Sequence, residues 1–234
     1  FAKKRQFFWS LVWVGFFYNF GLWLDKFMFW FYEPTSQPII GPLRASLIYD
    51  IPVFLAYLSI IPGMAVFLVK METDFVEFYD NFYNAVREGG SLEYMEKMRN
   101  EMVFTIRQGI YQIIKIQAIT TLAVFVAGEI ILNFLGISLL YLPLLFVNLI
   151  SVGLQVVFLG ILNVFFYLDK RRIVLLLTAL FVLFNGIFTA ITLYLGPKFY
   201  GYGLAAALLV CIMIGFRFLD RVFEELEYST FMLQ

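Results

Sequence analysis

The sequence predicts an all-α polytopic membrane protein with six transmembrane helices and one cytoplasmic amphipathic helical hairpin. Two observations support this fold class. Of the 234 residues, 62% are hydrophobic and only 15% are charged, whereas soluble domains are about half apolar. The apolar residues form long runs, and roughly 20 such residues in a helix cross the hydrocarbon core of a bilayer. The predicted spans are residues 7–31, 47–71, 109–135, 137–168, 173–195 and 202–222, with the hairpin at 72–108.

The first predicted span, residues 7–31, has two distinct faces at the helical repeat of about 100° per residue. One face is aromatic throughout and consists of Trp9, Trp13, Phe16, Phe20, Trp23, Phe27 and Trp30. This face either contacts lipid, with its terminal tryptophans in the interfacial belts, or forms a stacking platform for sugar rings. The other face carries Asn19, Asp25 and Lys26. Lipid cannot solvate these side chains, so we expect them to point into the bundle or a wet cavity, unless Asp25 and Lys26 reach the outer interface.

The second predicted span, residues 47–71, contains Asp50, Pro52 and Pro62. Proline removes a backbone donor and kinks a helix, and broken spans often border the cavities of transporters. The alternative is a purely structural kink, with Asp50 close enough to the outer end to reach water. The preceding segment, residues 32–46, holds three prolines and a glycine and predicts an irregular outer loop.

The hairpin at 72–108 combines two apolar stripes with an acidic surface. The stripes consist of Phe75, Phe78, Tyr79, Phe82, Tyr83 and Val86, and then of Met95, Met98, Met102 and Ile106. Gly89 and Gly90 separate the two helices, Ser91 is a good N-cap, and methionine suits adaptable contact surfaces. Eight acidic side chains outnumber four basic ones, which favours a protein partner or self-packing of the hairpin over binding to anionic lipid; a solvated hairpin without a partner is the alternative. The candidate docking residues are Glu93, Glu96 and Glu101.

Uncharged polar side chains form narrow stripes in the fourth and fifth predicted spans. In lipid, such side chains either hold helices together, at roughly 0.6 kcal/mol each, or line a path for a solute rich in hydroxyls and amides. The candidates for a substrate path are Asn19, Asp25, Asp50, Asn148, Gln155 and Asn185. The last span has a small residue at every fourth position, which lets two helix backbones approach closely. These candidate packing residues are Gly203, Ala207, Cys211 and Gly215.

The distribution of basic residues predicts the orientation in the membrane. Basic residues cluster at Lys3–Arg5, in the hairpin and at Lys170–Arg172, whereas the outer loops carry only Arg44 and Lys198. The positive-inside rule therefore places both ends of the chain in the cytoplasm. The chain opens at Phe1 without Met or a cleavable signal pattern, so we expect it to be part of a longer protein.

The residue inventory argues against an enzyme, a cofactor and a metal site. The chain has no histidine and one cysteine, which excludes His-dependent catalysis, Cys-based metal binding and an intrachain disulfide. No Gly-rich phosphate loop precedes a helix. The 17 basic and 17 acidic residues balance, so no basic surface indicates nucleic acid. Any transport is then driven by an ion gradient, a coupled enzyme or mass action.

Several long motifs carry a resemblance to a known family. They are LIYDIPVFLAYLSIIPG at 47–63, ETDFV at 72–76, VREGGSLE at 86–93, NVFFYLD at 163–169 and TFMLQ at 230–234. With these motifs, most of the chain from around Asp25 onward resembles the C-terminal half of the Pel exopolysaccharide transporter family, PelG, within the flippase-like MATE/MOP superfamily. The resemblance implies that residues 1–234 form the C-terminal six-helix bundle of a transporter.

The resemblance also implies a function and its partners. We expect a bacterial inner-membrane exporter that moves a growing, N-acetylgalactosamine-rich polysaccharide during biofilm formation. Its implied partners are a cytosolic glycosyltransferase, a cyclic-di-GMP-binding membrane protein and a tetratricopeptide-repeat membrane protein. Two other functions stay open from the residues. One is an ion-coupled antiporter or flippase for small cationic or lipid-linked solutes, with Asp25, Asp50 or Glu129 as the ion site. The other is a non-transporting scaffold that anchors a polysaccharide synthase through the hairpin.

Overall fold

The computed structural model describes residues 9–224, and its class is all-α, as the sequence predicts. The helices are α1 (Trp9–Phe31), α2 (Leu47–Leu58), α3 (Ile60–Val69), α4 (Phe75–Glu88), α5 (Leu92–Phe134), α6 (Leu142–Tyr167), α7 (Arg171–Leu195) and α8 (Tyr202–Glu224). A π-helical turn occupies Lys70–Asp74, and 3-10 turns occupy Leu139–Tyr141 and Pro197–Phe199. The basic cluster Lys3–Arg5 and residues 225–234, both expected in the cytoplasm, lie outside the described residues.

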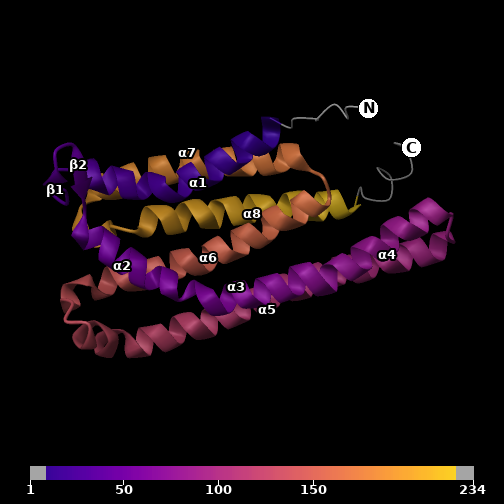
Figure 1. Ribbon diagram of the computed structural model, residues 1–234, viewed down its shortest axis with the longest axis horizontal. Coiled ribbons are helices and arrows are strands. Elements are labelled where there is room, and N and C mark those ends of the chain that lie inside the picture. The colour runs from indigo at the N-terminus through magenta and orange to yellow at the C-terminus, as the bar shows by residue number, and fades with distance from the viewer. Residues whose placement is uncertain (1–8, 225–234) are drawn as a thin grey trace.

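The long helices run side by side between the two ends of the molecule (Figure 1). One end carries the connections after α1, α5 and α7, and the other carries the α4–α5 hairpin and the α6–α7 turn. Helix α7 packs against α1 and α8, while α6 packs against α8, α2 and α5. Helix α1 is therefore attached to the bundle mainly through α7 and has little contact with α2.

Among the described residues, 4 helices are long and apolar enough to cross a membrane, and the bent pair α2–α3 raises the number to 5 if it forms one span. The four are residues 92–134, 139–167, 171–195 and 197–224. The six predicted spans are reproduced only in part, because the mean hydropathy of α1 is lower than that of these helices. Its tryptophans and tyrosine have polar groups, and it also contains Asn19, Asp25 and Lys26.

The second predicted span is broken at Ser59, where α2 and α3 meet with a bend of 41°. Pro62 follows the break and cannot donate a hydrogen bond to the carbonyl of Leu58, so regular helical bonding fails at this point. Pro52, which was also expected to interrupt the span, lies inside α2. Gln117 of α5 donates its Nε2 to the carbonyl oxygen of Ser59 at 3.2 Å. This hydrogen bond ties the break to the neighbouring helix.

The α4–α5 hairpin is continuous with the helices on either side of it. The π-helical turn leads from α3 into α4, and α5 runs unbroken from Leu92 to Phe134, so the second helix of the hairpin and the third predicted span form one helix. The turn itself has the expected chemistry. Gly89 adopts a φ of 72°, and Ser91 Oγ accepts a hydrogen bond from the backbone N–H of Tyr94 at 3.3 Å.

The two apolar stripes of the hairpin are buried against each other. Phe75, Phe82 and Met102 are 0% exposed, and Met95 is 8% exposed. Phe75 also contacts Tyr167 of α6, with ring centroids 5.1 Å apart. Side chains packed in this way are not available to a partner. The interpretation of the methionine stripe as an adaptable contact surface is therefore wrong.

The connection at 32–46, expected to be irregular, contains a small antiparallel hairpin of β1 (Gln37–Ile40) and β2 (Leu43–Ala45). Gly41 adopts a φ of 55° between the strands, a conformation that glycine permits in a tight turn. The register shifts between Pro38 and Ile40, which accommodates a proline that cannot donate to the ladder. Strands this short leave too little alternation in the sequence to be recognised.

The small residues of α8 lie where the helix meets its neighbours. A Cβ atom at Gly203 would lie 2.6 Å from the backbone nitrogen of Thr189 in α7, and one at Gly215 would lie 2.9 Å from Ile161 in α6. Ala207 and Cys211 are 0% exposed. Helix α8 thus approaches α7 so closely at Gly203 that no side chain fits there.

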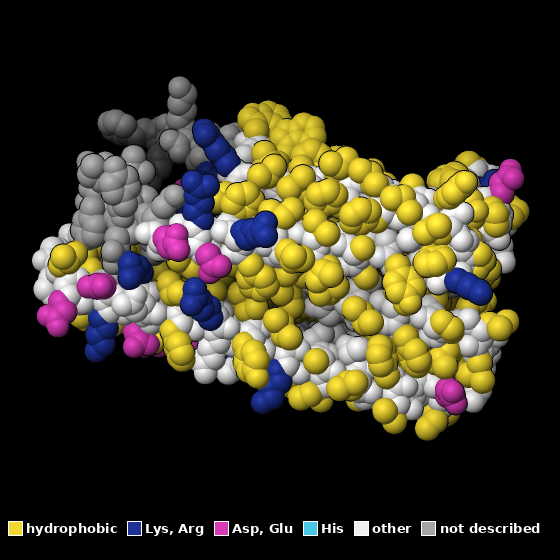
Figure 2. Space-filling view, turned by 180° about the vertical axis from the view of Figure 1, so that it is seen from behind, with side chains coloured by type: hydrophobic (Ala, Val, Ile, Leu, Met, Phe, Trp, Pro, Cys, Tyr) yellow, Lys and Arg dark blue, Asp and Glu magenta, His cyan; other side chains and the backbone are white. Residues whose placement is uncertain are grey.

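Charged side chains gather around the hairpin end of the molecule, next to a broad apolar band (Figure 2). At this end Arg107 Nη2 of α5 lies 3.3 Å from Asp220 Oδ1 of α8, and Arg171 Nε lies 2.5 Å from Asp169 Oδ1 in the α6–α7 turn. The separation of a charged end from an apolar band is typical of a protein whose helices cross a bilayer.

Candidate functional site

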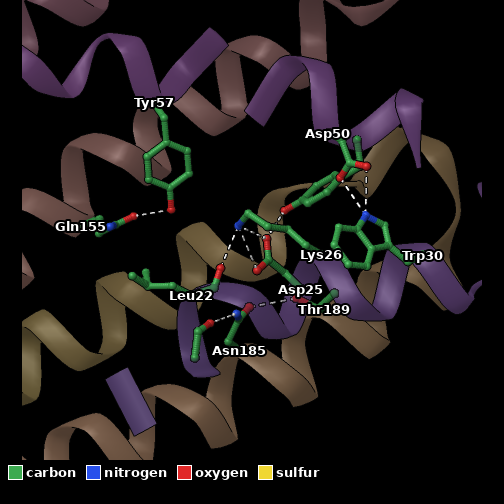
Figure 3. Close-up of polar contacts among 11 residues, drawn as sticks. Leu22, Asp25, Lys26, Trp30, Asp50, Tyr57, Gln155, Asn185 and Thr189 are labelled. Carbon is green, nitrogen blue, oxygen red and sulfur yellow. Dashed lines mark hydrogen bonds and ion pairs between the residues drawn. The ribbon is translucent and has the colours of Figure 1, made fainter. Parts of the chain in front are cut away.

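A groove of about 530 Å³ opens between α1 and α2. Its aromatic and charged lining residues are Trp23, Lys26 and Trp30 of α1 and Asp50, Phe54 and Tyr57 of α2. The groove exists because α1 packs on α7 whereas α2 packs on α6, so the two helices have little contact with each other. Buried polar side chains lie at its base, and Figure 3 shows their contacts.

Asp25 is completely buried, and two neighbours compensate its carboxylate (Figure 3). Tyr49 Oη of α2 donates a hydrogen bond to Asp25 Oδ2 at 2.5 Å, and Lys26 Nζ lies 3.4 Å from both carboxylate oxygens. Lys26 Nζ also donates to the backbone oxygen of Leu22 at 2.8 Å. Removing one partner from such a buried pair leaves an uncompensated charge, which is costly. Lys26 lines the groove, whereas the fully buried Asp25 does not. The pair is therefore a fixed element beside the groove.

Asp50 is held by three hydrogen bonds where the C-terminal end of α1 meets the N-terminal end of α2. Trp30 Nε1 donates to the two Asp50 carboxylate oxygens at 2.9 and 3.0 Å, and the backbone N–H of Ser46 donates to Asp50 Oδ2 at 3.0 Å. The carboxylate lies in the first turn of α2, where the helix dipole favours negative charge. Asp50 therefore stabilises the start of α2 as well as lining the groove.

Tyr57 and Gln155 join α2 to α6 at the base of the groove. Tyr57 Oη donates to Gln155 Oε1 at 2.7 Å, and Tyr18 of α1 also interacts with the Gln155 amide. Lys26 Nζ lies 5.5 Å from the centroid of the Tyr57 ring, within the range of a cation–π contact. These contacts connect Gln155 to the Asp25–Lys26 pair.

Asn185 and Asn148, two further predicted path residues, do not line the groove. Asn185 Nδ2 donates to the backbone oxygen of Gly21 at 2.8 Å, and its Oδ1 accepts from Thr189 Oγ1 at 3.0 Å. Asn185 thus holds α7 to α1. Asn148 Nδ2 donates to the carbonyl oxygen of Leu144 in its own helix at 2.9 Å, and its side chain is buried.

Asn19, expected in the bundle or a wet cavity, does not point into the bundle and instead lines a surface pocket with aromatic residues of α1. Its side chain is exposed and donates to the carbonyl of Gly15 at 2.8 Å. Asn19 precedes Trp23 by one helical turn, so the two side chains share the outer face of α1. Trp13 on this face is 50% exposed and Trp23 is 49% exposed, which leaves the aromatic rings on the surface of the molecule.

Lys26, Tyr49 and Tyr57 complete the polar cluster but are absent from the predicted path residues. The signal that identifies the tyrosines is the repeat of Tyr49, Val53 and Tyr57 at every fourth position of α2. At the helical repeat this spacing places both hydroxyl groups on the side of α2 that faces α1 and α6. The sequence does not say which helices they meet.

The site offers non-covalent contacts rather than reactive groups. Among the described residues, no three or more His, Cys, Asp or Glu side chains are grouped so that they could hold a metal ion. The groove presents flat aromatic rings beside an ammonium group and a carboxylate, a combination that suits a bulky polar solute. The predicted docking residues lie elsewhere, on the hairpin, where Glu93 and Glu96 are exposed and Glu101 is half-buried.

The comparison with protein families gives one match, which spans nearly the whole chain. Residues 1–231 match the family model described as "PelG: Putative exopolysaccharide Exporter (EPS-E)". No curated protein and no solved structure matches the chain.

Proposed function

The chain belongs to the PelG family of exopolysaccharide exporters, and from this premise we propose that it helps to move a growing polysaccharide across the bacterial inner membrane through contacts in the α1–α2 groove. The polymer is Pel-like and rich in N-acetylgalactosamine, and its export contributes to biofilm formation. The family match supports export of an exopolysaccharide. The groove is the proposed location of the contact with the polymer.

The lining of the groove is the observation that carries this proposal. A sugar ring has apolar faces and an edge of hydroxyl groups, so it is held by flat aromatic side chains together with hydrogen-bonding groups. Trp23, Trp30 and Phe54 supply the rings, while Lys26 and Asp50 supply the polar groups. A volume of about 530 Å³ lies within the range of pockets that bind small molecules, which is enough for a short stretch of a chain.

The proposed topology has six spans, formed by α1, the bent pair α2–α3, α5, α6, α7 and α8. The alternating course of these helices supports it (Figure 1). The hairpin and both ends of this chain lie in the cytoplasm, because the basic residues favour that side. The hairpin then faces the cytosolic glycosyltransferase, and the cyclic-di-GMP-binding and tetratricopeptide-repeat membrane proteins of the same system are the further partners.

A matched pair of tryptophans in α1 tests the contact. Trp23 lines the groove whereas Trp13 does not, yet their exposed fractions are 49% and 50%. We expect Trp23→Ala to reduce secreted polysaccharide, measured with a glycan-binding probe, while Trp13→Ala leaves secretion unchanged. Both variants must be present in the membrane at wild-type levels. Equal secretion by the two variants would remove the groove from the proposed path.

A second function, ion-coupled exchange, is favoured by the burial of the Asp25–Lys26 pair. Ionisable side chains inside a membrane often belong to ion or proton pathways. Vesicles that contain the full-length protein and a pH-sensitive dye test this function directly. Proton entry that depends on added oligosaccharide would support coupling to a proton gradient. The absence of such entry, with polymer transport intact, would exclude it.

A further inference from the structure

A second cavity of about 410 Å³ lies on the same side of α1, nearer the hairpin end. Helices α1, α3 and α6 line it, with Tyr18, Phe67 and Asn163 among the contributing residues. Residues of α1 between Leu22 and Trp30 line the α1–α2 groove, and residues of α1 between Leu11 and Tyr18 line this inner cavity. The two spaces therefore follow one another along the same helix.

Three polar side chains stand between the inner cavity and the groove. Tyr18 lines the inner cavity and Tyr57 lines the groove. Gln155 accepts the hydrogen bond from Tyr57 at 2.7 Å and also interacts with Tyr18. The link between the two spaces therefore includes contacts among hydroxyl and amide groups, and a polar solute can replace such contacts.

The helix that carries Tyr57 ends at a break in the chain. Helix α2 ends one residue after Tyr57, and the chain bends by 41° into α3 at Ser59. Short helices that meet at a break rotate about it more readily than a continuous helix bends, because the break already lacks regular hydrogen bonds. Two tyrosine hydroxyls hold α2 against the cluster: Tyr57 on Gln155 and Tyr49 on Asp25.

We propose that α2 is a gate, in which the Tyr57–Gln155 hydrogen bond closes a passage that runs through this bundle from the inner cavity to the α1–α2 groove. Rotation of α2 about Ser59 breaks this hydrogen bond and joins the two spaces. The passing ligand is a single polysaccharide chain, whose hydroxyl groups take over the hydrogen bonds of Tyr18, Tyr57 and Gln155. This inference rests on the proposed export function.

Thiol labelling tests the gate without requiring export. In a Cys211→Ala background, Asn163→Cys places the only thiol of this chain in the inner cavity. The full-length protein is labelled in intact cells with a membrane-impermeant maleimide added from outside. Tyr57→Phe keeps the aromatic ring and removes only the hydroxyl. We expect it to raise the labelling rate about fivefold, the factor that the loss of one hydrogen bond gives, and Tyr57→Ala to raise it further.

The matched control is Tyr111→Phe, since Tyr111 is an exposed tyrosine of α5 away from both spaces. It should leave the labelling rate unchanged. An unchanged labelling rate in both Tyr57 variants would overturn the gate. Normal labelling of a cysteine introduced at Gln37 shows that the variants are folded. Because labelling needs no polymer, this failure is distinct from a failure of the export proposal, which the tryptophan pair tests.

Discussion

Asp25 has two partner side chains from different elements inside the bundle. Lys26 supplies the opposite charge from the same helix, and Tyr49 supplies a hydrogen bond from α2. Neither contact alone satisfies the carboxylate, which has two oxygens and is 0% exposed. The stability of the α1–α2 region is therefore sensitive to single changes in this group.

Asp25→Asn should lower the stability of the protein by about 3–5 kcal/mol, because it leaves Lys26 buried without its counter-charge. The double variant Asp25→Leu/Lys26→Met removes both charges and should recover most of the loss. Thermal unfolding of the purified protein in detergent measures both effects. Glu33→Gln, at an exposed position, is the control. A single variant as stable as the wild type would contradict the assigned role of the pair.

The sequence identifies some members of the cluster and misses others for physical reasons. Asp25 is recognisable because a carboxylate inside an apolar run must find partners. Tyr49 and Tyr57 are not, because a tyrosine in a membrane helix equally suits an interfacial position. Asn19 lies one helical turn before Trp23 and shares its face of α1, although the polarity of the side chain suggested the opposite face. Side-chain polarity alone does not determine which way a helix faces.

Among the helices, α8 shows most directly how residue size sets the distance between elements. Gly203 leaves no space for a Cβ atom against α7, and the fully buried Ala207 follows one turn later. The packing of α7, α8 and α6 is close along this stripe. Space for an added side chain is therefore absent on one face of α8 and present on the other.

Ala207→Leu should destabilise the protein by about 1–3 kcal/mol through overpacking. The matched control is Ala206→Leu, which adds the same atoms to the exposed neighbouring position and should change stability by less than roughly 0.5 kcal/mol. Thermal unfolding in detergent compares the two variants. Equal loss in both would show that this face of α8 is not a close helix contact.

The α4–α5 hairpin remains the proposed docking element for the glycosyltransferase, with its acidic surface as the contact. Because the apolar stripes are buried, the proposed contact uses Glu93, Glu96 and the half-buried Glu101. Reversing these three charges to lysine should weaken co-purification of the enzyme at least about tenfold, since like charges across an interface cost several kcal/mol. Glu33→Lys, at the opposite end of the molecule, is the control. Unchanged co-purification would move docking away from this surface.

Element boundaries were predictable where a residue type forces them. Pro62 and the Gly89-Gly90 pair mark a break and a turn because one lacks a donor and the other permits positive φ. The chain stays helical through residues 70–74 and 108, where the sequence changes from apolar to charged. Such a change indicates different surroundings for the side chains, but the backbone hydrogen bonds continue, so the sequence alone does not show that the helix continues. Composition therefore shows where a helix leaves the apolar layer, not where it ends.

At the scale of the whole molecule, the proposed six-span topology separates a highly charged, hairpin-bearing end from the β1–β2 end. Single cysteines at Asn84 in α4 and at Gln37 in β1, both exposed positions, test it in a Cys211→Ala background. We expect an impermeant maleimide to label the cysteine at residue 37 from outside the cell and the one at residue 84 only after the membrane is opened. Labelling of both from the same side would contradict the topology.

The number of apolar runs and the all-α class follow from the sequence because the bilayer dictates helix length and internal hydrogen bonding. The packing partners do not follow, because lipid-facing and helix-facing apolar residues are chemically alike. In particular, the packing of α1 on α7 rather than on α2 creates the groove, and no pattern within α1 specifies it. The site therefore became visible only with the arrangement of all helices.

The central claim is that the exported polysaccharide touches the α1–α2 groove. A photoreactive benzoylphenylalanine at Trp23, compared with one at Trp13 on the same helix, measures this contact in cells that are synthesising the polymer. The account predicts a light-dependent, glycan-positive product of high mass at position 23, which a glycoside hydrolase removes and which is absent when synthesis is blocked. Crosslinking to glycan at position 13 but not at position 23 would contradict it.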